Sequence, residues 1–422
     1  MTHPDFAKAA ATITTERVRD CLMDLVNIGS PTGQEAGVAH YLVDRMRKIG
    51  MDTDLPLVDA GRPNAVGHRR GRGDGLNLLF TGHMDTSYSG DEEHLDGEGF
   101  KPKAIERDGW IWGLGANNMK SGLASILIAV EAIAKAGITL DGDISFGGVV
   151  GEIEKTAVEE FQGVEYSGYG TGTRHLVTHG VTADFALLAE PTGSRISVAN
   201  LGVIWLRISV GGTVAHSAWS NRPDTVNAIA VMHELQTDLA AWAKSYYDSH
   251  VFMGEHPNVT VAAIRGGAPW RLSRNPHECS LYLDIRTVPG QTVDSVKREL
   301  RRVLRGFAER TGRPEPSIHV YVSDPPTVLD ESLPIIQALG AAQTTVTGSR
   351  PASIIRRPGA DAVHLTNYGV PCVCFGPGGR THPDTKGQSM HAFGEHVLVE
   401  DCVAAAKIYL ALALDLCNRK AL

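Results

Sequence analysis

The sequence has little cysteine, no long apolar run and no excess of basic residues. Six cysteines among 422 residues are too few for a disulfide scaffold, so we expect six free thiols. No apolar run approaches the roughly 18 residues that a membrane-spanning helix needs. The N-terminus has neither the basic nor the apolar region of a signal peptide. These features predict a cytoplasmic protein that does not interact with a membrane.

The charge balance argues against nucleic acid as a partner. Lysine and arginine number 40 against 48 acidic residues, so the formal net charge is −8. Such a chain offers no broad basic face to a phosphate backbone. The apolar share of 42% and the charged share of 21% are those of an ordinary globular protein. At this length, two or three domains are expected.

The first half of the chain alternates helical and strand patterns, which is typical of a layered α/β domain. Helical periodicity covers residues 16–28, 38–49 and 121–136, and short apolar runs typical of buried strands cover 76–80, 144–150 and 185–189. His83, Glu152 and Glu190 follow these three runs. Because open α/β sheets bind ligands at the carboxyl ends of their strands, we expect a site there.

From residue 201 the pattern changes to strand-like alternation, with two helical stretches between the strands. Four strands and two helices predict an independent α+β unit over residues 201–323. The α/β pattern then resumes and ends in a helix over 399–416. We therefore predict an α/β domain formed by residues 1–200 and 324–422, with the α+β domain inserted into it.

His83 and Asp85 stand two positions apart at the end of the first strand-like run. In a strand this spacing turns both side chains to the same face. The histidine can then bind a metal ion while the carboxylate fixes the tautomer of its ring.

Several segments in a fixed order carry a family resemblance. They are residues 82–86, 112–120, 151–154, 189–192, 211–217, 284–286, 375–378 and 389–395. This ordered set resembles the zinc aminoacylase/carboxypeptidase metallopeptidases, a family that includes acetylornithine deacetylase, succinyl-diaminopimelate desuccinylase and the folate-cleaving carboxypeptidase. The resemblance implies a three-layer α/β metallopeptidase domain with a mixed, mostly parallel sheet. It also implies an inserted lid domain through which the chain forms a homodimer or a higher oligomer.

The resemblance further implies a two-metal site at the edge of the sheet. By position, His83 and Glu190 resemble the ligands of one metal ion, and His391 resembles a ligand of the other. Glu152 resembles the general base, and Asp85 would orient His83.

Three positions in the lid domain resemble substrate-contacting residues of the family. His216 resembles the histidine that reaches the partner subunit's active site and stabilises the developing oxyanion. Arg286, with Asn258, resembles the clamp for a substrate carboxylate, a group that a planar guanidinium binds well. An ion pair between Arg286 and Asp284 is the alternative for that arginine.

The chain departs from the family at two metal-binding positions. Asn118 stands where the family has a bridging aspartate, and Ile153 stands where a second glutamate binds metal. Two divalent ions about 3.5 Å apart repel each other by roughly 19 kcal/mol at an effective dielectric of ~20. A neutral amide oxygen cannot offset this repulsion as a carboxylate does. We therefore predict one loosely held ion, bound by His83 and Glu190 with either Asn118 or His391.

Zinc, manganese and cobalt suit this ligand set comparably. In an alternative alignment with the family, shifted by two residues, Glu154 becomes a ligand. Strand geometry permits this, because Glu152 and Glu154 would share one face of a strand. The glycine-rich segment 155–179 is also longer than the family usually shows. It is either a surface loop or a loop that overhangs the pocket.

These observations leave three hypotheses about function. The first is a metal-dependent hydrolase that cleaves the C–N bond of a small carboxylate-bearing substrate, either an N-acyl amino acid or a short peptide. The second is a hydrolytic deaminase of an amino-aromatic acid, similar to the nitroanthranilate aminohydrolase branch of the family, which needs only one metal ion. The third is an inactive small-molecule binder, against which the retained Glu152 argues.

Overall fold

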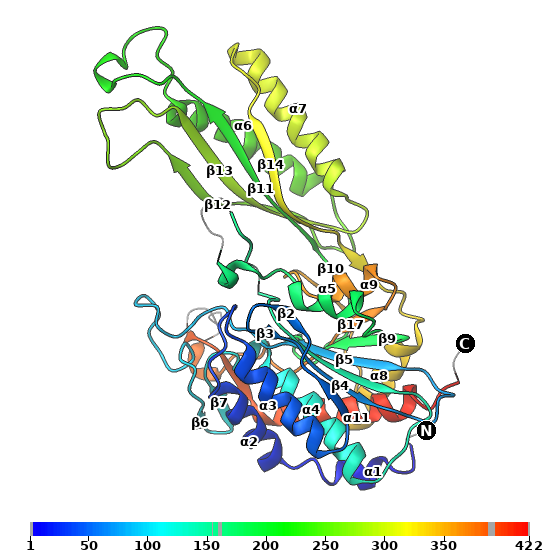
Figure 1. Ribbon diagram of the computed structural model, residues 1–422. Helices are drawn as coiled ribbons and strands as arrows, with labels where there is room; N and C mark the ends of the chain where they lie inside the picture. The colour runs from blue at the N-terminus through cyan, green and yellow to red at the C-terminus, as the bar shows by residue number, and fades with distance from the viewer. Residues whose placement is uncertain (1–2, 154, 159–162, 387–392, 421–422) are drawn as a thin grey trace. The chain divides into compact units, whose positions relative to one another are not determined.

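The computed structural model describes residues 3–153, 155–158, 163–386 and 393–420 (Figure 1). The chain forms two compact units. Unit 1 comprises Met1–Val198, Leu329–Arg356 and Ala360–Leu422, and unit 2 comprises Ala199–Val328 and Arg357–Gly359. The boundaries predicted from the sequence were at residues 200 and 324. All six cysteines are buried free thiols, as expected.

A nine-stranded mixed sheet forms the centre of unit 1 and confirms the predicted α/β class. In spatial order its strands are β1 (Asp52–Asp54), β4 (Ala65–Arg69), β8 (Ile144–Val149), β5 (Leu78–His83), β9 (Phe185–Leu188), β17 (Cys372–Cys374), β10 (Ser197–Asn200) and β15 (Thr327–Val328), with β16 (Ile354–Arg356) paired to β10. The central strands β8, β5, β9 and β17 run parallel, and the outer pairs are antiparallel. Every residue of β5 and β8 is buried, as expected for parallel strands that are covered on both faces.

Helices cover both faces of this sheet. They are α1 (Phe6–Ala10), α2 (Thr15–Val26), α3 (Ala36–Lys48), α4 (Ser121–Lys135), α5 (Thr171–Thr178), α8 (Pro334–Thr347), α9 (Ala362–Asn367) and α11 (Val399–Leu416). Helix α4 packs against α2 and α11, whereas α5 packs against α9. Figure 1 shows α4 and α11 below the sheet of unit 1 and α5 and α9 above it. Thr14 caps α2 by accepting a hydrogen bond from the Arg17 backbone N–H.

Shorter elements surround the central sheet. They are the helical segments η1 (Ala116–Lys120), η2 (Val164–Tyr166) and η4 (Pro383–Thr385), the two-stranded sheet of β2 (Leu57–Asp59) and β3 (Arg62–Pro63), and the three-stranded sheet of β6 (Ile105–Arg107), β7 (Trp110–Trp112) and β18 (His396–Leu398). The segment η1 matters for the site, because it carries Asn118.

Unit 2 is a two-layer α+β unit with its own apolar core. Its antiparallel sheet has the order β12 (Asn258–Gly266), β13 (Glu278–Thr287), β11 (Gly202–Gly211) and β14 (Ser317–Asp324), and its helices are η3 (Ser217–Trp219), α6 (Ala228–Ser249) and α7 (Val293–Thr311). Side chains of β11 alternate between buried and half-buried, so one face of the strand packs against the helices. No helix in the described part of the chain is long and apolar enough to cross a membrane.

Candidate metal centre

Three neighbouring parallel strands bring a histidine and two glutamates together at one edge of the central sheet. His83 ends β5, Glu152 follows the end of β8, and Glu190 follows the end of β9. One potential ligand atom from each residue lies within 4.8 Å of the other two, and all three side chains are buried. Among the described residues no other such group was found. We call these three residues the acid–histidine cluster.

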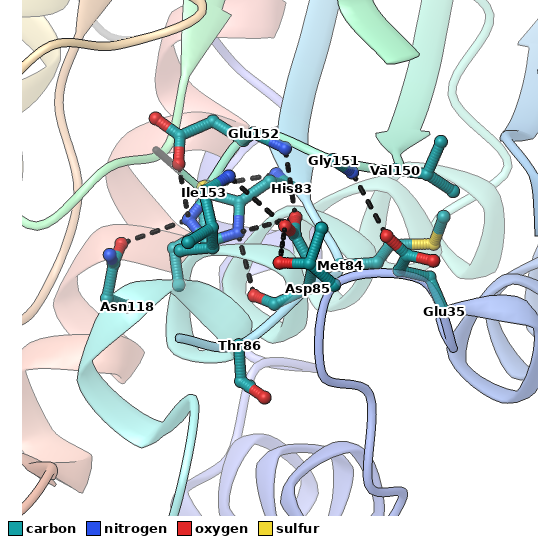
Figure 2. A network of polar contacts seen from close by, with 12 residues as sticks. Glu35, His83, Met84, Asp85, Thr86, Asn118, Val150, Gly151, Glu152 and Ile153 are labelled. Carbon is teal, nitrogen blue, oxygen red and sulfur yellow. Dashed lines mark hydrogen bonds and ion pairs between the residues drawn. The ribbon is translucent and has the colours of Figure 1, made fainter. Parts of the chain in front are cut away.

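His83 presents one ring nitrogen to the cluster and the other to Asp85. Its Nε2 lies 3.6 Å from Glu190 Oε1 and 3.7 Å from Glu152 Oε2. Its Nδ1 hydrogen-bonds the backbone carbonyl of Asp85 at 2.9 Å and lies 3.4 Å from the Asp85 carboxylate. In the neutral ring with its proton on Nδ1, the Nε2 lone pair faces the two glutamates, as metal binding requires. Figure 2 shows the ring between Asp85 on one side and Glu152 and Asn118 on the other.

Asp85 also fixes the turn that carries Glu152. Its carboxylate accepts hydrogen bonds from the backbone N–H groups of Glu152 and Ile153, each at 3.1 Å, and from the Thr32 hydroxyl at 2.9 Å. Asp85 therefore joins the end of β5 to the end of β8. This second contact was not foreseen from the sequence, where Asp85 was assigned only to His83.

The charges of the cluster are poorly balanced by protein groups alone. Burial lowers the pKa of His83, but Glu152, Asp85 and Glu190 outweigh burial and raise that pKa well above its ordinary value. Burial and the neighbouring Glu190 raise the pKa of Glu152 well above its ordinary value. Carboxylates crowded in a buried site are typical of cation-binding centres.

Glu190 is the residue that most directly indicates that the cluster suits a cation. The side chain is fully buried, and its Oε2 accepts a hydrogen bond from Arg356 Nη2 at 2.6 Å. Its Oε1 has no hydrogen-bond partner among the described residues, although it faces His83. Imidazole nitrogen and carboxylate oxygen are ligands for divalent transition metals such as zinc, manganese and cobalt, so the residues present fit such an ion.

Asn118 lies beside the cluster, with its Oδ1 3.1 Å from His83 Nε2. The backbone N–H groups of Asn117 and Asn118 donate to the Glu395 carboxylate at 3.1 and 2.8 Å, which holds this segment in place. Ile153 is buried and offers only an aliphatic side chain. Two of the sequence candidates, Glu154 and His391, lie outside the described residues.

The remaining predicted site residues belong to unit 2. His216 is exposed and accepts a hydrogen bond from the Ala218 backbone N–H at 3.1 Å, as the N-cap of η3. Asn258 and Arg286 are paired across β12 and β13. The Arg286 guanidinium forms two hydrogen bonds of 2.8 Å with Asp284, the alternative that the sequence left open.

Three residues around the cluster escaped the sequence prediction. Arg356 ends β16 and reaches Glu190. Asp361 is buried, accepts a hydrogen bond from the Thr173 hydroxyl at 2.6 Å, and has its pKa raised by burial to about 7. Glu395 lies in one of the segments that carry the family resemblance, but the sequence predicted no role for its side chain. Neither Arg356 nor Asp361 stands in a motif, so only the sheet topology could have revealed them.

The described part of the glycine-rich segment packs against the turn that carries Glu152. The backbone N–H of Tyr169 donates to the Ile153 carbonyl, and that of Gly170 donates to the Gly151 carbonyl. Arg62 donates to the carbonyls of Val164 and Ser167 at 3.2 and 2.8 Å. This segment is therefore tied to the Glu152 turn.

Comparisons with known proteins agree with this geometry. Residues 79–415 match the model of peptidase family M20/M25/M40. The chain is 26% identical to N-formyl-4-amino-5-aminomethyl-2-methylpyrimidine deformylase of Bacillus subtilis, covering 92% of this chain and 91% of that protein. It is 29% identical to succinyl-diaminopimelate desuccinylase of Gluconacetobacter diazotrophicus, covering 92% and 94%.

Solved structures share the fold. An aminopeptidase of Bacillus cereus superposes with a TM-score of 0.73 at 20% identity, covering 96% of this chain and 99% of that one. A dinuclear metal-binding peptidase of Bacillus subtilis superposes with a TM-score of 0.65 at 18% identity, covering 95% and 97%. The family model covers most of the chain and includes the whole acid–histidine cluster, which confirms the resemblance drawn from the sequence. The chain belongs to peptidase family M20/M25/M40, whose members are hydrolases of C–N bonds.

Proposed function

We propose that this hydrolase is a metal-dependent N-deacylase, which cleaves the amide bond between an acyl group and the amine of a small carboxylate-bearing molecule. The observation that carries the proposal is the buried acid–histidine cluster, in which Glu190 Oε1 lies beside His83 and has no hydrogen-bond partner within the described part of the chain. The two curated relatives compared above are named as a deformylase and a desuccinylase, and both names describe removal of an acyl group.

In this proposal His83 and Glu190 hold one divalent ion, with Asn118 next to them. When bound, such an ion supplies Lewis-acid chemistry, which polarises the amide carbonyl and makes water more acidic. Glu152 accepts the proton of the attacking water and passes it to the leaving nitrogen. Asp85 holds both the His83 ring and the Glu152 turn, so these groups keep their relative positions.

In this proposal three residues of unit 2 contact the substrate. Arg286 and Asn258 bind the substrate carboxylate, and His216 stabilises the developing oxyanion in the partner subunit's site. These three roles come from the family resemblance, and the pairing of Arg286 with Asp284 orients its guanidinium.

A second candidate function is hydrolytic deamination of an amino-aromatic acid. Asn118 and Ile153 favour it, because these neutral side chains weaken the case for a second metal ion. Addition of water to an electron-poor ring carbon, with loss of ammonia, needs one ion and a proton acceptor such as Glu152.

Metal removal and a substrate panel test both candidates. Protein dialysed against EDTA should lose activity and regain it with zinc, manganese or cobalt. We expect release of a primary amine from N-formyl, N-acetyl or N-succinyl amino acids, with much less from their carboxyl methyl esters as matched controls. Ammonia release from aminobenzoates, without amine release from the N-acyl compounds, would favour the deaminase instead. Absence of turnover with every metal would contradict both functions.

We also propose that unit 2 mediates homodimer formation, as the resemblance implies. Its strand β12 lies at the edge of the sheet and exposes the apolar side chains of Val261 and Ile264. Edge strands of this kind readily pair with another chain. We expect light scattering to give twice the mass of one chain, and Ile264→Lys to shift the protein toward the monomer. Leu57→Lys, which alters an exposed leucine of unit 1, is the control and should leave the mass unchanged.

A further inference from the structure

Arg356 is an unusual residue to find beside a candidate metal centre. Its side chain is 9% exposed, and its Nη2 lies 2.6 Å from Oε2 of the fully buried Glu190. Burying a guanidinium is costly unless a nearby anion compensates it. The neighbouring Arg357 shows the contrast, because it is 54% exposed and pairs with Glu255 instead.

The ion pair with Arg356 places the two oxygens of the Glu190 carboxylate in different surroundings. Oε2 accepts a hydrogen bond from Arg356, while Oε1 faces His83 Nε2 at 3.6 Å and receives no hydrogen bond from any residue that the structure describes. A carboxylate held in this way can offer a metal ion one oxygen. For its second oxygen a metal ion would have to compete with the guanidinium, which already donates a hydrogen bond to that oxygen.

The groups around the cluster match the charge of one divalent ion. The carboxylates of Asp85, Glu152 and Glu190 carry three negative charges. These equal the single positive charge of the Arg356 guanidinium plus the two positive charges of one divalent ion. A second divalent ion would leave two positive charges uncompensated, or one if Asp361 is ionised. Asn118 and Ile153 cannot supply the difference, because one is a neutral amide and the other an alkyl side chain.

We propose that Arg356 is the fixed second cation of this site, a positioning residue that limits the chain to one divalent ion. The guanidinium performs the charge-balancing task that a second metal ion would otherwise perform, and it fixes Glu190 as a ligand through a single oxygen. The inference rests on the proposed function only in requiring that the acid–histidine cluster binds a metal ion. It is independent of the substrate and of the bond cleaved.

Metal stoichiometry, measured without substrate, tests the inference. Purified chains are stripped with EDTA, equilibrated with a fixed free concentration of zinc or manganese, and assayed for ions bound per chain. We expect one equivalent for the unaltered protein. The variant N118D restores one carboxylate but keeps Arg356, so a second divalent ion would still leave a positive charge uncompensated, and this variant should bind one equivalent. In the variant N118D/R356Q the four carboxylates balance two divalent ions, so it should bind two.

Matched variants separate a charge effect from a structural one. Arg356→Lys keeps the charge, so in the N118D background it should hold the stoichiometry at one. Arg357→Gln removes the adjacent exposed guanidinium and should likewise leave the stoichiometry at one in that background. If the N118D/R356Q variant does not fold, the N118D chain still decides the matter.

Two equivalents in the unaltered protein or in N118D would overturn the inference and leave the proposed function standing. An N118D/R356Q variant that folds and still binds one equivalent would also overturn it. Failure of the unaltered protein to bind any divalent ion would contradict the proposed function itself, and the inference with it.

Discussion

Replacing Glu152 with glutamine is expected to lower kcat by roughly 10²–10⁴-fold, the usual contribution of a general base. The Glu152 carboxylate lies within the acid–histidine cluster, with Oε2 3.7 Å from His83 Nε2. Glutamine keeps the size of the side chain but cannot accept a proton from water. The backbone N–H of residue 152 still donates to Asp85, so the turn should survive the substitution. The measurement is kcat with the best substrate of the panel at saturating metal.

Metal content decides which role Glu152 has. If Glu152 acts as the proton acceptor, Glu152→Gln should bind the ion with nearly unaltered affinity. A parallel loss of metal affinity would make Glu152 a ligand instead, and another group would have to serve as the base. Glu165→Gln is the control, since Glu165 is exposed on the segment packed against the same turn. Unchanged kcat in Glu152→Gln would contradict the mechanism.

The strand ends explain why part of the centre was predictable from the sequence. His83, Glu152 and Glu190 each follow a short apolar run, and parallel strands present their carboxyl ends at one edge. The alternation of helical and strand patterns and the order of the motifs therefore indicated which side chains would lie together at that edge. The same regularity made the mixed α/β sheet predictable, because β5 and β8 are continuous buried runs.

Other groups reach the centre through tertiary contacts that leave no local pattern. Arg356 is 166 positions from Glu190 and arrives on a three-residue strand that pairs with β10. Asp361 is 188 positions from its partner Thr173. Neither spacing has a helical or strand period that sequence reasoning could detect. The sequence showed that Asn118 and Ile153 depart from the family pattern. It gave no indication that Arg356 lies near the same centre.

Replacing Arg62 with methionine is expected to lower the free energy of unfolding of unit 1 by about 3–5 kcal/mol. Arg62 and Glu35 are both fully buried and form two hydrogen bonds, of 2.6 and 3.0 Å. Without the guanidinium, the Glu35 charge would lie unpaired in the interior. The carbonyls of Val164 and Ser167 would lose their donor as well. Urea unfolding followed by a probe in unit 1 measures the change.

The same substitution should also lower activity, because Arg62 holds the Glu35 carboxylate, which accepts from the Gly151 backbone N–H at 3.2 Å, next to Glu152. The double variant R62M/E35L removes both charges, so it should regain part of the stability. It should not regain activity, since the backbone N–H of Gly151 then has lost Glu35 as its acceptor. Arg72→Met is the matched control: its pair with Asp141 is exposed, so we expect a change of about 0–1 kcal/mol. If Arg62→Met were no less stable than Arg72→Met, the buried pair would not be what fixes the Glu152 turn.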